Sequence, residues 1–179
     1  HHKVLVAKGC FKVGLYKQGL LHDMSKYSPT EFRVGVKYYQ GTRSPNNAER
    51  EDIGYSSAWL HHKGRNKHHY EYWIDYSMQA LPGGMAPVPM PDRYIAEMIM
   101  DRIAASKVYM GEAYTDRSPL EYYYRGTDKA PIHPETKAKL LYVLEMLAEQ
   151  GEEKTFRFVK EELVQHKRCV DWHRLEKAE

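Results

Sequence analysis

The chain has 179 residues, 42% of them hydrophobic and 28% charged, which is enough for one domain with a full hydrophobic core. Its formal charge of +3 is small and its basic residues are mixed with acidic ones, so the sequence carries no strong nucleic-acid signal and no membrane surface. No apolar run approaches the roughly 20 residues that span a bilayer, and no secretory signal pattern opens the chain, so we expect a cytoplasmic protein.

Helical patterns occupy much of the chain. Residues 3–21 carry a dense apolar pattern that suits a buried helix, although Gly9, Gly14 and Gly19 weaken it. The segment Ser28-Pro29-Thr30-Glu31 is typical of a helix start, because Ser caps, Pro fits the first turn and Glu completes a capping box. Further helix starts are predicted at Ser44-Pro45, at Ser118-Pro119-Leu120-Glu121 and at His133-Pro134-Glu135, with the last helix running to Gly151.

A loop is predicted before the second half of the chain. Residues 81–91, LPGGMAPVPMP, hold four prolines and two glycines, which neither a helix nor a central strand accommodates. Apolar residues at helical spacing then run from residue 92 to about 114. Few stretches alternate with a period of two, and no repeat or linker is visible. We therefore predict one all-α domain over residues 1–179, with about seven to nine helices and its core at about 2–165.

Histidine rather than cysteine carries the candidate chemistry. Cys10 and Cys169 lack a CxxC spacing, which favours free core thiols over a disulfide or a thiolate zinc site. Among the ten histidines, His22 stands next to Asp23 at the end of an apolar helical run. Burying an ionised Asp is costly unless a cation or hydrogen bonds compensate, and a bound metal would compensate.

Asp101 and two pairs of histidines extend this set. Asp101 lies in the middle of an apolar helical stretch, where a metal or an ion pair with Arg102 or another basic residue would balance its charge. His61-His62 and His68-His69 are separated by five residues, and neutral imidazole is the commonest metal ligand. Gly64 is expected to end a helix between the pairs, so that a turn could aim one His of each pair into one cavity.

The order of these residues resembles the motif of the HD-domain superfamily of metal-dependent phosphohydrolases. That motif is a His, then His-Asp, then a distant Asp, which His2, His22-Asp23 and Asp101 match. His-Asp-Met-Ser-Lys is similar to the family's His-Asp-x-Gly-Lys, with Ser25 in place of Gly and Lys26 retained. GLLHDMSKYSPTEF, YYQGTRSPNNAERE, AWLHHKGRNKHHYEYW and EMIMDRIAASK resemble an uncharacterised bacterial branch, over the chain from His2 to about Glu162.

The resemblance implies an HD-like helical bundle that binds one or two divalent transition-metal ions, namely Mn, Fe, Co, Ni or Zn. It makes His2, His22, Asp23 and Asp101 the ligands of a first ion, with Asp23 the bridge to a second. One His from each later pair would hold the second ion, either His61 with His68 or His62 with His69. His1 and His2 are also open to a different interpretation, as the remnant of an expression tag.

The expected reaction is attack by a metal-bound hydroxide on a small phosphoester, possible at neutral pH because a metal lowers the pKa of its bound water from 15.7 toward about 7. Asp23, Lys26 and Glu71 are the candidate catalytic residues, Glu71 as a proton donor. The candidate substrate-binding residues are Lys26, Lys63, Arg65, Asn66, Lys67 and Arg102. The cations are equally interpretable as surface charges, Glu71 as a surface carboxylate and Asn66 as a left-handed turn residue.

Three classes of function follow from this set. The first is a phosphohydrolase with a small anionic substrate, such as a nucleotide; the second is a di-iron HD-type oxygenase. The third is a non-catalytic, metal-stabilised module that binds a ligand. The fifteen tyrosines fit either stacking on a nucleobase or packing in the core, and an oligomer is compatible with all three classes.

Overall fold

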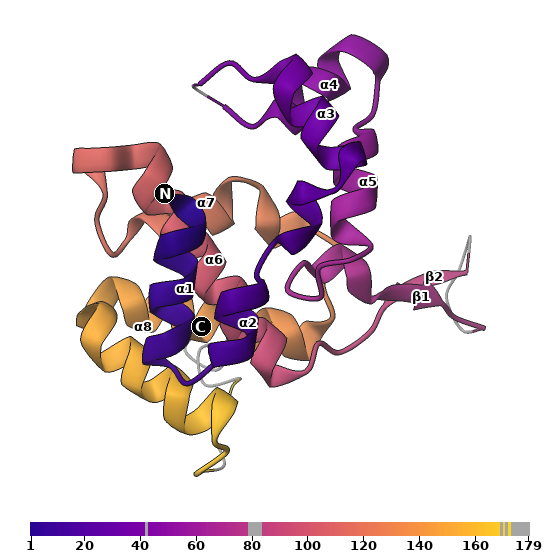
Figure 1. The fold of residues 1–179 in the computed structure, drawn as a ribbon. Coiled ribbons are helices and arrows are strands. Elements are labelled where there is room, and N and C mark those ends of the chain that lie inside the picture. The colour runs from indigo at the N-terminus through magenta and orange to yellow at the C-terminus, as the bar shows by residue number, and fades with distance from the viewer. Residues whose placement is uncertain (42, 79–83, 169, 171, 173–179) are drawn as a thin grey trace.

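The predicted all-α fold is confirmed by a computed structural model, which describes residues 1–41, 43–78, 84–168, 170 and 172 (Figure 1). Within these residues the α-helices are α1 (His2–Lys12), α2 (Tyr16–Leu21), α3 (Pro29–Tyr38), α4 (Pro45–Ile53), α5 (Ser57–Lys63), α6 (Asp92–Met110), α7 (Ser118–Gly126) and α8 (Pro134–Phe158). Short helical segments are η1 (Met24–Tyr27), η2 (Tyr70–Trp73), η3 (Gly111–Ala113), η4 (Thr127–Lys129) and η5 (Val159–Val164), and the two strands are β1 (Ile74–Tyr76) and β2 (Met85–Pro87). None of the described helices combines the length and apolar character of a membrane span.

Helix α6 is the centre of the hydrophobic core. It packs against α1, α7, α8 and η5, and its buried side chains include Ile95, Ile99 and Ile103. Each large aliphatic side chain that is fully buried contributes about 1.5–3 kcal/mol of transfer free energy. Polar side chains on such a helix are therefore held on a rigid support.

Helices α3, α4 and α5 form a lobe above this body in the view of Figure 1. The buried carboxylate of Glu49 in α4 accepts hydrogen bonds from Ser56 Oγ and Ser57 Oγ, both at 2.6 Å. Ser56 Oγ in turn accepts from the backbone N–H of Trp59 at 3.0 Å and caps α5. The start of α5 is thereby fixed, which sets the direction of the two histidines at its other end.

The apolar stretch 3–21 forms two helices rather than one. The chain turns at Gly14, whose φ of 88° lies in the left-handed region that glycine tolerates best. Helix α2 then folds back onto α1 so closely that a Cβ on Gly19 would lie 2.9 Å from Cys10 Cβ and 2.9 Å from Phe11 Cε1. The close contact places the end of α2, and with it His22, beside α1.

Two other boundaries differ from the prediction. Part of the predicted loop at 81–91 is strand β2, which pairs antiparallel with β1, Pro87 opposite Ile74; residues 81–83 lie outside the described residues. Proline is tolerated because each strand of a two-stranded sheet keeps one edge free. The helical run of α8 breaks at Gly151 as predicted, since φ is 77° and ψ is 172° there, but a second helical run follows directly and extends α8 to Phe158.

Candidate metal centre

His22 and Asp23 form the turn between α2 and η1. Asp23 has φ 55° and ψ 27°, a left-handed conformation that is uncommon for residues other than glycine and occurs often at functional sites. This turn buries two adjacent side chains together, with His22 1% and Asp23 4% exposed. The structure therefore brings both motif residues into the interior at the same point.

A first group of possible ligands comprises His2, His22 and Asp101. Asp101 Oδ1 lies 2.9 Å from His2 Nε2 and 3.4 Å from His22 Nε2, while His22 Nε2 also lies 3.4 Å from Asp23 Oδ2. The charge of Asp101 is thus balanced by imidazoles, and no ion pair with Arg102 is found among the described residues. Residues from α1, the α2–η1 turn and α6 meet here although Asp101 lies about 80 to 100 positions after the two histidines in the sequence.

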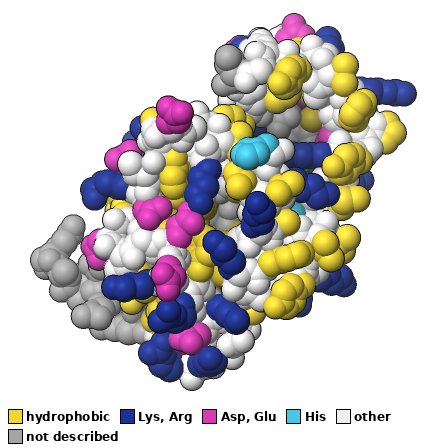
Figure 2. All heavy atoms as spheres, turned by 60° about the vertical axis from the view of Figure 1, so that its left-hand side comes forward, with side chains coloured by type: hydrophobic (Ala, Val, Ile, Leu, Met, Phe, Trp, Pro, Cys, Tyr) yellow, Lys and Arg dark blue, Asp and Glu magenta, His cyan; other side chains and the backbone are white. Residues whose placement is uncertain are grey.

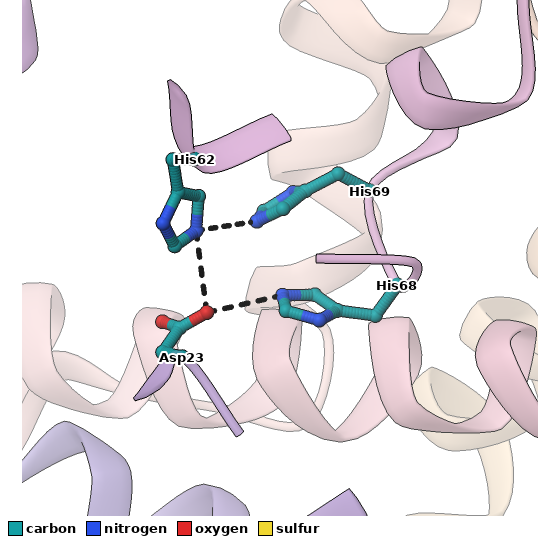
Figure 3. A group of neighbouring side chains, drawn as sticks. All are labelled: Asp23, His62, His68 and His69. Carbon is teal, nitrogen blue, oxygen red and sulfur yellow. Dashed lines mark hydrogen bonds and ion pairs between the residues drawn. The ribbon is translucent and has the colours of Figure 1, made fainter. Parts of the chain in front are cut away.

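A second group comprises Asp23, His62, His68 and His69 (Figure 3). Asp23 Oδ1 lies 3.2 Å from His62 Nε2 and 3.5 Å from His68 Nε2, and the Nε2 atoms of His62 and His69 are 2.9 Å apart. Asp23 therefore presents one carboxylate oxygen to each group. Gly64 ends α5 as expected, and the turn that follows brings both members of the second His pair to His62.

Two buried glutamates hold the histidines from behind. Glu97 Oε1 lies 3.0 Å from His22 Nδ1 and 3.2 Å from His68 Nδ1. Glu31 contacts His61 Nδ1 through Oε1 at 2.6 Å and His62 Nδ1 through Oε2 at 2.7 Å. Hydrogen bonds of this kind from the second ring nitrogen to a carboxylate commonly orient metal-ligating histidines.

Three buried atoms that face the two groups lack a hydrogen-bond partner: His22 Nε2, His68 Nε2 and Asp23 Oδ1. Their contacts of 3.2–3.5 Å with oppositely charged groups do not have hydrogen-bond geometry. Leaving a buried polar atom unsatisfied costs about 1–3 kcal/mol. A cation between these atoms would satisfy them, so the residues present fit a metal ion.

The electrostatics of the site favour ionised carboxylates. Burial alone would raise the pKa of Asp23, but its close contacts with His22 and His62 and the charge of Lys26 hold that pKa well below its usual value. The pKa of Asp101 is shifted in the same direction, because its close contacts with His2 and His22 outweigh the effect of burial. Burial would lower the pKa of His22, yet the neighbouring carboxylates raise it to about 11. A metal ion would have to displace that proton.

The pKa of His69 shifts the opposite way. Burial lowers it well below the usual value, and the neighbouring His68 adds to the effect. A neutral imidazole is the form that binds metals. A donor set of imidazole nitrogens and carboxylate oxygens suits first-row transition metals better than Mg²⁺ or Ca²⁺, which prefer oxygen ligands.

Two predicted residues lie beside the groups in other roles. His61 points to Glu31 and belongs to neither group, so the alternative pairing of His61 with His68 is not formed. Asn66 is buried, and its Nδ2 donates to Ser25 Oγ at 2.7 Å and to the backbone oxygen of His62 at 2.8 Å. Because Asn66 lacks a positive φ, the left-handed-turn interpretation is wrong; the side chain ties α5 to η1.

The predicted cations differ in their distance from the two groups. Lys26 Nζ lies 2.6 Å from Asp23 Oδ2, although its side chain is 55% exposed. Lys63 is half-buried and Lys67 is exposed with its amine over aromatic rings. Exposed Arg65 donates to the backbone oxygen of His61 at 3.4 Å. None of these last three contacts a residue of the first group.

Arg102 and Glu71 each leave a buried atom unpaired. Arg102 Nη1 donates to Thr127 Oγ1 at 3.2 Å, but Nε is buried without a partner, and so is Glu71 Oε2. Burial lowers the pKa of Arg102, against the charge of Asp101 and other neighbours, which raise it. Arg102 is therefore a cation next to a possible metal ligand, with no carboxylate paired to it among the described residues.

Sequence reasoning missed Glu31 and Glu97. Glu31 was predicted to complete a capping box, but its carboxylate turns to the histidines of α5, and only Ser28 Oγ caps, accepting from Glu31 N–H at 3.4 Å. Glu97 lies four residues before Asp101, on the same face of α6, and this spacing is the signal that could have identified it. Little histidine shows on the face drawn in Figure 2, as expected from the burial of His22, His62 and His68.

Comparisons with known proteins place the whole site within a matched region. A protein-family model described as a family of unknown function (DUF5662) matches residues 1–146, which include every residue of the two groups. None of the curated proteins and none of the solved structures matches the chain significantly.

Proposed function

Because the chain belongs to DUF5662, whose function is unknown, we propose its function from the site: a metal-dependent hydrolase of HD type that acts on a small phosphoester or nucleotide. The observation that carries the proposal is the position of Asp23. Its two carboxylate oxygens face two groups of imidazoles, and His22 Nε2 and His68 Nε2 point into these groups without hydrogen-bond partners. This arrangement is what a site for one or two divalent ions requires.

The HD assignment is supported by the order and the convergence of the motif residues. His2, His22, Asp23 and Asp101 occur in the order of that motif, and contacts of 2.9–3.4 Å connect them. Both agree with the resemblance to HD-type phosphohydrolases.

A divalent ion bound here would supply a water activated at neutral pH and would polarise a phosphoryl oxygen. Side chains near the ion would bind the substrate, neutralise charge and donate a proton. Arg102, which lacks a carboxylate partner among the described residues, would bind an anionic oxygen of the substrate, and Lys26 would neutralise charge beside Asp23. Glu71, with its unpartnered Oε2, would protonate the leaving group.

The two groups equally fit a pair of irons, which makes an HD-type oxygenase the second candidate. The observation in its favour is the carboxylate of Asp23 between two sets of imidazoles, as a binuclear centre requires. Anaerobic purification followed by a spectroscopic search for coupled irons separates the two candidates. We also propose a cytoplasmic location, which the buried free thiol of Cys10 supports. The substrate would be a small anion, because Arg102 has no carboxylate partner among the described residues, and the proposed site is compatible with an oligomer.

The test combines metal analysis with a substrate screen. Protein purified without nickel resin is loaded in turn with Mn, Fe, Co, Ni and Zn, its metal content is measured, and phosphate release from phosphorylated metabolites is followed. We expect one to two ions per chain and turnover that is lost in Asp101→Asn but kept in the exposed control Asp75→Asn. Folded, metal-loaded protein that releases phosphate from no substrate would contradict the hydrolase proposal.

A further inference from the structure

One carboxylate connects the two candidate metal positions. We propose that Glu97 is a positioning residue that orients one ligand of each position at once, so that the two positions are coupled through α6. This inference rests on the proposed metal-dependent function. Glu97, His22 and His68 also lie close enough together to hold an ion themselves, so direct ligation by Glu97 is the alternative that the experiment below must separate from positioning.

The geometry is that of one oxygen shared by two rings. Glu97 Oε1 lies 3.0 Å from Nδ1 of His22, which belongs to the first group, and 3.2 Å from Nδ1 of His68, which belongs to the second. The two imidazole rings lie against one another, with their centroids 4.4 Å apart. All three side chains are buried, and Glu97 is only 5% exposed.

The orientation of the two rings follows from these bonds. An imidazole that donates from Nδ1 to a carboxylate carries its lone pair on Nε2. In both His22 and His68, Nε2 is the buried atom without a hydrogen-bond partner, and it faces Asp23 at 3.4 and 3.5 Å respectively. Glu97 therefore turns the ligating nitrogen of both rings toward the space where the ions would bind.

Helix α6 supplies a rigid support for this role. Glu97 is flanked by Ala96 and Met98, both buried in the core, and it lies one turn before Asp101 on the same helix face. The same turn of α6 thus provides a direct ligand of the first position and the residue that orients a ligand in each. Glu31, in contrast, holds His62 of the second group and His61 outside both.

This arrangement distinguishes Glu97 from ligands that belong to one position only, such as Asp101 and His69. Loss of Asp101 should weaken only the first position, and loss of His69 only the second. Loss of Glu97 should weaken both, by about 10- to 100-fold each, the range found when carboxylates behind ligating histidines are removed. A direct ligand and a positioning residue also differ in their tolerance of glutamine, whose amide oxygen still accepts hydrogen bonds but is a poor metal ligand.

The experiment is a titration of metal-free protein with Co²⁺, followed by visible absorption and calorimetry, so that binding is read without turnover. Wild type should bind in two resolvable steps. Glu97→Leu should weaken both steps, Glu97→Gln should recover much of the affinity, and Asp101→Asn should weaken one step. The control is Glu162→Gln, which changes an equally buried carboxylate that is paired with Arg168 instead of histidines.

Each result bears on a separate claim. If Glu97→Leu weakens only one step or neither, the inference is overturned; if Glu97→Gln is as weak as Glu97→Leu, Glu97 is a direct ligand and the inference is likewise overturned. If Glu97→Leu does not fold in chelator, Glu97→Gln carries the test, and a modest loss in both steps supports the inference. Cobalt binding without phosphate release would contradict only the proposed hydrolase function. Wild type that binds no cobalt would contradict both that function and the inference on Glu97.

Discussion

Lys26 forms an ion pair with Asp23 at 2.6 Å, on the same carboxylate oxygen that faces His22. A lysine in that place competes with a metal ion for Asp23 and, by its charge, repels the ion. It also offers a cation to an anionic substrate. Lys26 should therefore weaken metal binding but favour turnover, and a substitution of Lys26 tests the proposed function through these two opposite effects.

Replacing Lys26 by Gln should tighten Co²⁺ binding and slow phosphate release. The gain in affinity should stay below about fivefold, because an exposed ion pair contributes ~1 kcal/mol or less. Calorimetric titration and steady-state assays of the same preparation measure both. Lys17→Gln, which changes an exposed lysine of α2, is the control, and a Lys26→Gln variant with unchanged turnover would contradict the role of Lys26 in substrate binding.

The adjacent histidines of α5 form a matched pair of variants. His62→Ala should remove a ligand of the second group and lower the metal content, whereas His61→Ala should leave the content near that of wild type, because His61 contacts Glu31 and neither group. Mass spectrometry of the native protein counts the bound ions. An equal loss of bound metal in both variants would contradict the assignment of His62, rather than His61, as the metal ligand on α5.

Metal removal should lower thermal stability. Ligand at a hundred times its dissociation constant stabilises the folded state by about 2.7 kcal/mol, and one kcal/mol shifts the melting temperature of a chain of this length by about 2–4 °C. A chelator should therefore lower the melting temperature by roughly 5–10 °C. Differential scanning calorimetry measures the shift, and Asp101→Asn should show a smaller one; a chelator without effect on wild type would contradict metal binding.

The thiol of Cys10 gives a prediction of pH dependence. Burial raises its pKa from 9.0 to about 12, and the charges of Glu97 and Asp101 add to the effect. Since the folded state holds the proton more tightly, this contribution to stability is complete below pH 9 and disappears as the pH rises toward 12.

The free energy of unfolding of wild type, relative to Cys10→Ala, should therefore fall over that range, as measured by urea denaturation. A difference that stays constant from pH 8 to about pH 11 would count against a buried thiol. Peptide mapping after alkylation of the folded protein at pH 8 should likewise find Cys10 unlabelled.

The helical fold and much of the site could be predicted from the sequence, because the signals were local. Ser28 before Pro29 marked the start of α3, and Gly64 marked the end of α5. The break at Gly14 was missed because it depends on packing, since α2 folds back over α1 there. The break at Gly151 was predicted, because glycine tolerates its positive φ, but the helical run from there to Phe158 was not. The extent of a single domain over residues 1–179 stays a prediction.

The site residues that the sequence identified are polar or charged residues in apolar helical stretches, where such side chains are rare. Asp23 and Asp101 stood out because a carboxylate beside apolar neighbours needs compensation. The choice within each His pair could not be made, since it depends on how the turn after α5 meets Asp23. Glu97 was not predicted, because a glutamate on a helix is common. Its contacts with two imidazoles from distant segments become visible only in the folded structure.

The close contact of α2 with α1 at Gly19 has a consequence for the metal centre. A methyl group at this position would meet Cys10 and Phe11 at 2.9 Å, so the two helices would have to separate. His22 follows only three residues later, at the end of the displaced helix. A Gly19→Ala substitution would therefore move His22 relative to Asp101 without changing any candidate ligand, so the absence of a side chain at Gly19 is a requirement of the candidate metal centre as well as of helix packing.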